Sequence, residues 1–282
     1  MRTLGDFLGD AVDTLTNVNG KLLKSLRLLL FRPGFLSAEH ARGARVPYVR
    51  PVQLFVVANL AFFLWSYVPI FSTPLQVHTW SQGFPHRAVA ERWVREAVAP
   101  DMTADEFRAV LLQAWSPFTT STPAVDVPPA TLAAMEALAQ QFNARVELQG
   151  RALVVLMIPL FAIWPGMLNL RRRRHAIEHL VFATHFMSLV LLAALAQMWL
   201  MRSIHAALQS LAGVDVALLQ SDPFNSMVLG LLMAAWLAAA VRVYYRRSWP
   251  AAVLQCLALV VLFLLSTQVF RAVLFFTTWW SL

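Results

Sequence analysis

The sequence has little charge and almost no cysteine. Only 13% of its 282 residues are charged, whereas about 25% is typical of soluble domains. Cys256 is the single cysteine, so one chain forms neither a disulfide framework nor a cysteine-rich zinc ribbon. The G-x-S-x-G, P-loop, G-x-G-x-x-G and HExxH motifs are missing too. The low charge argues against an ordinary soluble domain, and the missing motifs argue against the common classes of soluble enzyme.

The sequence contains several long apolar runs. Hydrophobic residues make up 59% of the chain, and crossing about 30 Å of hydrocarbon takes about 20 helical residues. The runs lack the alternating pattern of a membrane barrel, so helices must satisfy the backbone in lipid. The sequence therefore predicts an all-α, polytopic transmembrane bundle with about five spans: 52–71, 152–170, 177–202, 224–243 and 250–280.

The basic residues are concentrated in alternate connections between these spans. Under the positive-inside rule, this distribution predicts a cytoplasmic N-terminus, an external C-terminus and a multi-pass protein of the inner cell membrane. The net charge of +8 then points to anionic lipid headgroups as a partner. Nucleic acid is not expected, since no basic platform interleaved with aromatics is present. The residues expected to set topology and contact headgroups are Lys21, Lys24, Arg27, Arg32, Arg171, Arg172, Arg173, Arg174, Arg246 and Arg247.

The apolar runs and charges also divide the chain. Residues 1–50 form a basic cytoplasmic segment in which 18–31 is an amphipathic interfacial helix, ended by Pro33 and Gly34. Residues 51–71 are the first span, and residues 151–282 contain spans two to five. The division predicts one sizeable region outside the membrane, residues 72–150.

This 72–150 region is predicted to be a small helical outer cap that packs on the bundle. Helices are expected near 86–98 and near 104–115, where Thr103-x-x-Glu106 is a capping-box pattern. Pro128 and Pro129 favour the start of a third helix that continues into the second span.

The segment RRRRHAIEHLVFATHF, 171–186, places ionisable groups at the start of an apolar run. On a helix, Glu178 and His185 share a face but lie roughly 10 Å apart along the axis, so they cannot bind one ion together. His175 and His179 have the i,i+4 spacing of two metal ligands, although the adjacent arginines would repel a divalent cation. Three interpretations stay open: a structural role for Glu178 and the histidines, a polar site that binds or relays protons, and a metal site.

Four segments together resemble a bacterial membrane family, domain of unknown function 3667: LLLFRPGFL (28–36), YVRPVQLFVVANLAFFL (48–64), IEHLVFATHF (177–186) and VYYRRSWPAAVL (243–254). The resemblance implies a multi-helix membrane domain without an established activity. The positions that match the family signature are Arg32, Pro33, Gly34, Tyr48, Pro51, Glu178, His179 and His185. The chain departs from the family in lacking the N-terminal zinc ribbon of many members. It also has Met187 where the family often has a further histidine, and this second departure weighs against a metal centre.

Three functions follow as hypotheses. The first is noncatalytic transport or lipid handling, without a cofactor. The second is a membrane-embedded metal enzyme that uses His175, Glu178, His179 and His185. The third is a structural or assembly partner in the cell envelope, acting with another envelope protein or as a homo-oligomer.

Overall fold

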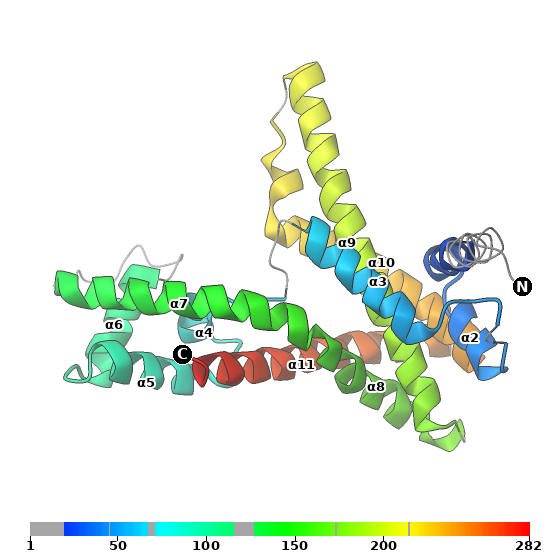
Figure 1. Ribbon diagram of the computed structural model, residues 1–282, viewed down its shortest axis with the longest axis horizontal. Helices are drawn as coiled ribbons and strands as arrows, with labels where there is room; N and C mark the ends of the chain where they lie inside the picture. The colour runs from blue at the N-terminus through cyan, green and yellow to red at the C-terminus, as the bar shows by residue number, and fades with distance from the viewer. Residues whose placement is uncertain (1–19, 45, 67–70, 116–126, 173, 214) are drawn as a thin grey trace, which may run out of the picture. The chain divides into compact units, whose positions relative to one another are not determined.

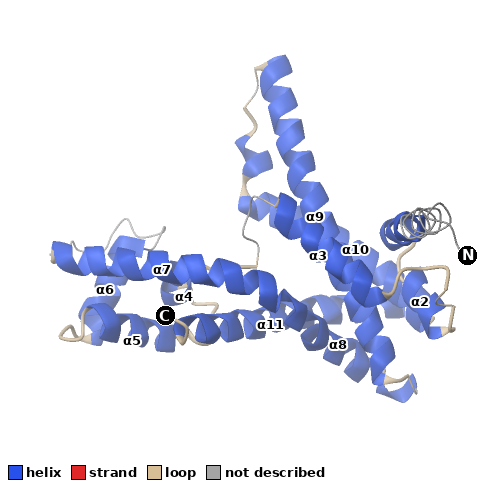
Figure 2. Cartoon of the chain, viewed as in Figure 1, coloured by secondary structure: helices blue, strands red, loops and turns tan. Residues whose placement is uncertain are grey.

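The computed structural model describes residues 20–44, 46–66, 71–115, 127–172, 174–213 and 215–282. Within these residues the regular structure is helical, with no strand, as Figure 2 shows. The all-α prediction is therefore confirmed for this part of the chain. Two compact units can be distinguished. Unit 1 comprises Met1–Tyr67 and Ile158–Phe263, and unit 2 comprises Val68–Met157 and Leu264–Leu282.

Unit 1 is organised around the long helix α9, Ala176–Ala212 (Figure 1). Helices α2, α3 and α10 all pack against α9, and the side chains of Phe62, Phe161 and Phe182 are fully buried. The other helices of this unit are residues 20–31, α2 (Phe35–Ala41), α3 (Pro51–Trp65), α8 (Met157–Leu168), α10 (Asp222–Tyr245) and the first part of α11 (Trp249–Trp279). Short 3₁₀ turns, η2 (Leu170–Arg172) and η3 (Ala217–Gln220), precede α9 and α10.

The helix ends follow from local sequence. Pro51 opens α3, a position where the missing backbone N–H costs nothing. Gly213, with φ 64°, ends α9 in the left-handed conformation that glycine adopts without strain. Arg246 ends α10 in the same conformation, with φ 50°. The turn at Arg246 brings Arg247 and Trp249 directly after the end of α10.

In the part of the chain that the structure describes, four helical stretches are long and apolar enough to cross a membrane: Pro129–Leu168, Ala176–Leu211, Asp222–Tyr245 and Trp249–Trp279. They cover the expected spans 152–170, 177–202, 224–243 and 250–280 almost completely. The first stretch begins well before 152, the second and third extend beyond the expected limits at both ends, and the fourth is offset from 250–280 by one residue. The first stretch also contains the third helix expected after Pro128, continued into the second span through η1 (Val154–Leu156).

The expected first span, 52–71, is shorter in the structure. Helix α3 has 15 residues, which corresponds to a length of about 22 Å. Ser66, the residue after it, is extended with ψ 131°. Residues 67–70 of the expected span lie outside the described residues. Helix α3 alone is thus shorter than a bilayer's hydrocarbon layer.

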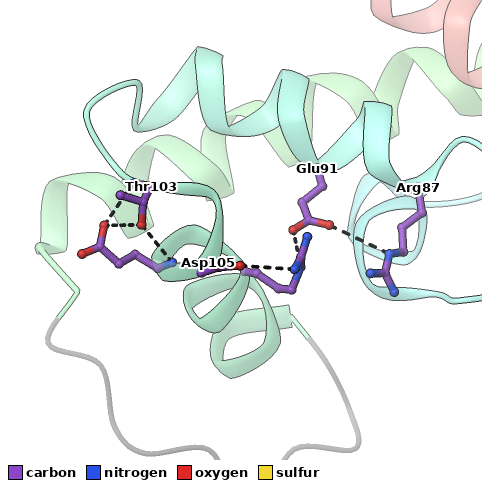
Figure 3. A network of polar contacts seen from close by, with 6 residues as sticks. Arg87, Glu91, Thr103 and Asp105 are labelled. Carbon is purple, nitrogen blue, oxygen red and sulfur yellow. Dashed lines mark hydrogen bonds and ion pairs between the residues drawn. The ribbon is translucent and has the colours of Figure 1, made fainter.

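Unit 2 contains α4 (Leu75–Trp80), α5 (Arg87–Val98), α6 (Ala104–Trp115), α7 (Pro129–Leu153) and the end of α11. Helices α5 and α6 match the predicted helices near 86–98 and 104–115, whereas α4 was not expected. The capping box forms: Glu106 Oε2 accepts hydrogen bonds from Thr103 N at 3.0 Å and Thr103 Oγ1 at 2.7 Å (Figure 3). These bonds stabilise the carboxylate and lower the pKa of Glu106.

Candidate functional site

The ionisable segment leads into α9, where it meets the end of α10. Arg174 Nη1 donates to Glu178 Oε2 at 2.7 Å, an i,i+4 ion pair. Arg174 Nη2 donates to the Tyr244 carbonyl at 2.9 Å, and the guanidinium lies 4.4 Å from the centroid of the Tyr244 ring. Glu178 is thus already paired with a basic residue, as the structural interpretation expects.

His179 contacts the same end of α10. Its Nδ1 is hydrogen-bonded to the Tyr245 hydroxyl at 2.8 Å, and the two rings are stacked. The Tyr244 hydroxyl donates to the Glu178 carbonyl at 3.0 Å. Both tyrosine side chains are almost fully buried. Neighbouring residues of α9 and α10 therefore form one interlocked polar cluster inside the packed helices.

His185 lies farther along α9 and has a different partner. Its Nδ1 is hydrogen-bonded to the hydroxyl of Ser37, on α2, at 2.9 Å. Both side chains are buried. His175, by contrast, precedes α9 as an exposed, extended residue without a side-chain cap hydrogen bond. The structure therefore brings Glu178 and His179 together through Tyr244 and Tyr245, and leaves His175 and His185 in separate surroundings.

This arrangement gives no geometry for a metal ion. In the described ranges, no three His, Cys, Asp or Glu side chains converge as ligands. Nδ1 of His179 faces the Tyr245 hydroxyl, and the other weak candidate, His175, is exposed. The chemistry that the cluster offers is neutral hydrogen bonding between helices together with one ion pair.

Several basic residues expected at the headgroups lie close to these helix ends. Arg247, after α10, donates from Nη2 to the Asn169 side chain at 3.2 Å, and Asn169 donates to the Pro165 carbonyl at 2.9 Å. Arg171 and Arg246 are exposed. Arg172 belongs to η2, and Arg173 lies outside the described residues. The turn after α10 is thereby tied to the end of α8.

With this geometry established, the chain can be compared with known proteins. Residues 19–63 match the model of the family described as protein of unknown function DUF3667. The resemblance to DUF3667 is confirmed for this segment. No curated protein and no solved structure matches the chain.

The DUF3667 segment packs closely on α9 and α10. Gly34, with φ 74°, faces the backbone of Ala240, and a Cβ at Gly34 would lie only 2.6 Å from the Ala240 carbonyl oxygen. Trp236 Nε1, on α10, donates to the Leu29 carbonyl at 2.9 Å. Ser37 supplies the contact to α9 through His185. Only glycine allows this approach of two backbones, which explains the glycine of the RPGF sequence.

Sequence reasoning did not identify several partners in these contacts. Tyr244 and Tyr245 lie in the VYYRRSW segment, but nothing in the spacing pairs them with residues 66 positions earlier. Ser37 is an ordinary small residue in the sequence and lies 148 positions from His185. A buried hydroxyl within hydrogen-bond distance of a buried histidine is found only when the helices are placed.

Proposed function

We propose that the protein is a multi-pass membrane protein that acts noncatalytically in lipid handling or transport and binds anionic lipid headgroups with the basic residues of unit 1. The proposal includes the inner cell membrane as its location, a cytoplasmic N-terminus and an external C-terminus. The four long apolar stretches support the membrane environment, and the distribution of basic residues supports the orientation.

The observation that carries the proposal is the two-sided character of helix 20–31. One side of the helix packs on the rest of unit 1: Ser25 Oγ accepts a hydrogen bond from Val49 N at 3.0 Å, and Leu29 is buried. The other side presents apolar groups outward, with Leu23 67% and Phe31 77% exposed. Lys21, Lys24 and Arg27 are also exposed on this helix.

An exposed leucine and phenylalanine among basic residues are unfavourable in water but suit the boundary between headgroups and acyl chains. The apolar side chains would enter the lipid, and the lysines and arginine would meet the phosphates.

Two basic side chains of unit 1, one of them on helix 20–31, lie over aromatic rings, an arrangement that also suits a membrane interface. Lys24 Nζ is 5.1 Å from the centroid of Tyr48, and the Arg242 guanidinium is 4.6 Å from the centroid of Trp249. Tyrosine and tryptophan favour the headgroup level because one part of each ring system is apolar and another part polar. These pairs support contact with anionic lipid on the surface that carries them.

The direct test compares lipid preference in the full chain. The protein is reconstituted in nanodiscs with mixtures of phosphatidylglycerol and phosphatidylcholine, and the lipids that stay bound are measured by native mass spectrometry. Each basic residue near an anionic surface contributes about 1 kcal/mol. We therefore expect Lys21→Gln/Lys24→Gln/Arg27→Gln to lose most of the preference for phosphatidylglycerol.

The matched control, Arg92→Gln/Arg145→Gln/Arg151→Gln, removes three positive charges from unit 2 and should keep the preference. Equal loss in both triple variants would refute the assignment to helix 20–31.

The polar cluster of α9 has its own test within this function. If Glu178 and His185 bind or relay protons, Glu178→Gln and His185→Ala will change solute flux or proton coupling in vesicles. Unchanged flux, lipid binding and proton coupling in both variants would remove the polar site from the proposal and leave a structural role.

A further inference from the structure

Unit 2 contains a buried pair of histidines. Nδ1 of His78, on α4, and Nε2 of His86, just before α5, lie 2.8 Å apart, a hydrogen-bond distance. His78 is fully buried and His86 nearly so. The two outer nitrogens, His78 Nε2 and His86 Nδ1, are also buried, and neither makes a hydrogen bond of normal geometry within the described residues. The pair is therefore closed to solvent at both ends.

Phenylalanine rings surround this pair. The centroid of His78 lies 5.1 Å from that of Phe84, 6.0 Å from that of Phe142 and 5.0 Å from that of Phe275. His86 is stacked on Phe84 and Phe275 at 5.4 and 5.1 Å. Residues of α4, α7 and α11 thus meet around the two imidazoles. The apolar rings take the place of water there and do not replace the hydration that a protonated imidazole would lose.

The charged groups on the surrounding elements do not compensate a positive charge on the pair. Arg271 of α11 lies with its guanidinium 5.5 Å from the centroid of Phe84, and its charge disfavours protonation of His78. Glu91 of α5 is engaged by Arg108 at 2.7 Å and lies 3.9 Å from Arg87. Glu147 and Arg151 of α7 pair with each other, and Asp105 and Glu106 of α6 interact with Arg108 and Thr103.

The number of protons on the two imidazoles determines how the pair responds to low pH. Two neutral imidazoles carry two N–H protons; one occupies the hydrogen bond between the rings and the other sits on an outer nitrogen. A third proton makes both outer nitrogens N–H donors and gives the pair a positive charge. Neither outer nitrogen makes a hydrogen bond of normal geometry to an acceptor in the closed cluster, and the backbone of Thr73 favours protonation of His78 less than burial opposes it. Water can therefore stabilise the charged pair fully only if the cluster opens.

We propose that the His78–His86 pair is an acid-sensitive latch that keeps unit 2 closed while both rings are neutral and opens it when the pair takes up a proton. The latch joins α4 to the start of α5 and to the end of α11.

The direction with pH follows from the surroundings. Burial, with a smaller effect of His86, lowers the pKa of His78 from 6.5 to about 3, and burial also lowers the pKa of His86. A histidine with a depressed pKa stabilises the closed form above the unfolded pKa of 6.5. That contribution is lost progressively as the pH falls from 6.5 toward 3. At about pH 5, one such histidine raises the open fraction about 30-fold over its value at about pH 7.5.

A cysteine reporter on α5 measures this opening in the full, reconstituted chain. Ala90 is fully buried and Ala88, on the same helix, is exposed. Each is changed to cysteine in a Cys256→Ala background, and the rate of thiol labelling is followed with pH. Because thiol ionisation affects both reporters, the ratio of the Ala90→Cys rate to the Ala88→Cys rate isolates opening. We expect this ratio to rise about 30-fold between about pH 7.5 and pH 5.

Replacing both histidines by phenylalanine, His78→Phe/His86→Phe, removes the titration and keeps the rings. In that background the ratio should stay constant with pH, whereas the control His175→Gln, at an exposed histidine, should retain the full rise. A constant ratio with both histidines present would overturn the latch, even if the double variant did not fold. An equal rise with and without the two histidines would overturn it as well.

Discussion

Basic side chains meet different partners in the two units. In unit 1, Lys24, Arg174 and Arg242 lie over the rings of Tyr48, Tyr244 and Trp249. In unit 2, arginines mostly meet carboxylates: Arg87 and Arg108 both approach Glu91, Arg92 approaches Glu96, and Arg151 approaches Glu147. Some residues depart from this division. In unit 1, Glu178 and Glu39 pair with Arg174 and Arg42. In unit 2, Arg271 lies over Phe84 and Arg95 donates to the Met102 carbonyl.

The difference indicates how each unit deals with charge. Carboxylates in unit 2 neutralise much of its positive charge locally. Aromatic rings in unit 1 orient Lys24 and Arg242 without neutralising them, which suits the proposed contact with an external anion. Unit 1 is in turn held together by close backbone packing and hydrogen bonds between buried neutral groups. Substitutions should therefore have different consequences in the two units.

The largest effect is expected at Gly34, where unit 1 depends on backbone contact. Gly34→Ala adds a Cβ 2.6 Å from the Ala240 carbonyl oxygen at a residue with φ 74°. The left-handed conformation costs about 1–2 kcal/mol for a non-glycine residue, and the forced shift costs a further 1–3 kcal/mol or so. We expect a loss of about 3 kcal/mol, measured as a lower thermal midpoint in detergent.

Gly43 provides the control for Gly34. It has φ 87° but open space around the position of a Cβ. Gly43→Ala should therefore cost only about 1 kcal/mol, the conformational part alone. Equal losses at both positions would show that contact with Ala240 does not matter.

Local sequence patterns predicted the local features of this fold. The Thr103-x-x-Glu106 spacing gave the capping box, and the i,i+4 spacing of Arg174 and Glu178 allowed their ion pair. The amphipathic pattern before Pro33 predicted a helix that the structure shows over 20–31. All three depend on neighbours within about one helical turn or on the periodicity of one helix, which a sequence displays directly.

Contacts between distant segments could not be predicted in the same way. His185 and Ser37, and His78 and Phe275, are joined only after helices pack. An apolar helix does not reveal which of its faces meets lipid and which meets protein, because both are apolar. The order of the segments suggested the membrane family, but the roles of Gly34 and Tyr245 required coordinates.

The next largest effect concerns the buried neutral hydrogen bond of unit 1. Ser37→Ala removes the partner of His185 Nδ1 and leaves a buried polar nitrogen, which costs about 1–3 kcal/mol. The measurement is a double-mutant cycle on thermal stability with Ser37→Ala, His185→Leu and the double variant. We expect a coupling energy of at least about 1 kcal/mol. Additive effects would mean that the two side chains do not stabilise each other.

A smaller effect is expected when a carboxylate of unit 2 is neutralised. Glu91→Gln weakens the contacts with Arg108 and Arg87, and since Arg108 is half exposed, solvent screens part of the interaction. We expect a loss of about 1–2 kcal/mol that shrinks at high salt. Glu96→Gln, which removes an exposed pair with Arg92, should change stability by less than about 0.5 kcal/mol. A loss at Glu91 that did not depend on salt would argue against an electrostatic origin.

The smallest change in stability is expected for single exposed arginines, yet these compare the two units most directly. Arg242→Gln removes a cation over Trp249, a contact that contributes about 0.5–1 kcal/mol at exposed sites. Arg92→Gln removes an exposed ion pair of about the same strength. Stability should therefore fall by similar amounts. The preference for phosphatidylglycerol should not fall equally in the two variants, because only Arg242 keeps its charge available to phosphate. Equal loss of phosphatidylglycerol binding in Arg92→Gln and Arg242→Gln would contradict the comparison. It would mean that a cation over an aromatic ring is no more available to lipid than a cation paired with a carboxylate.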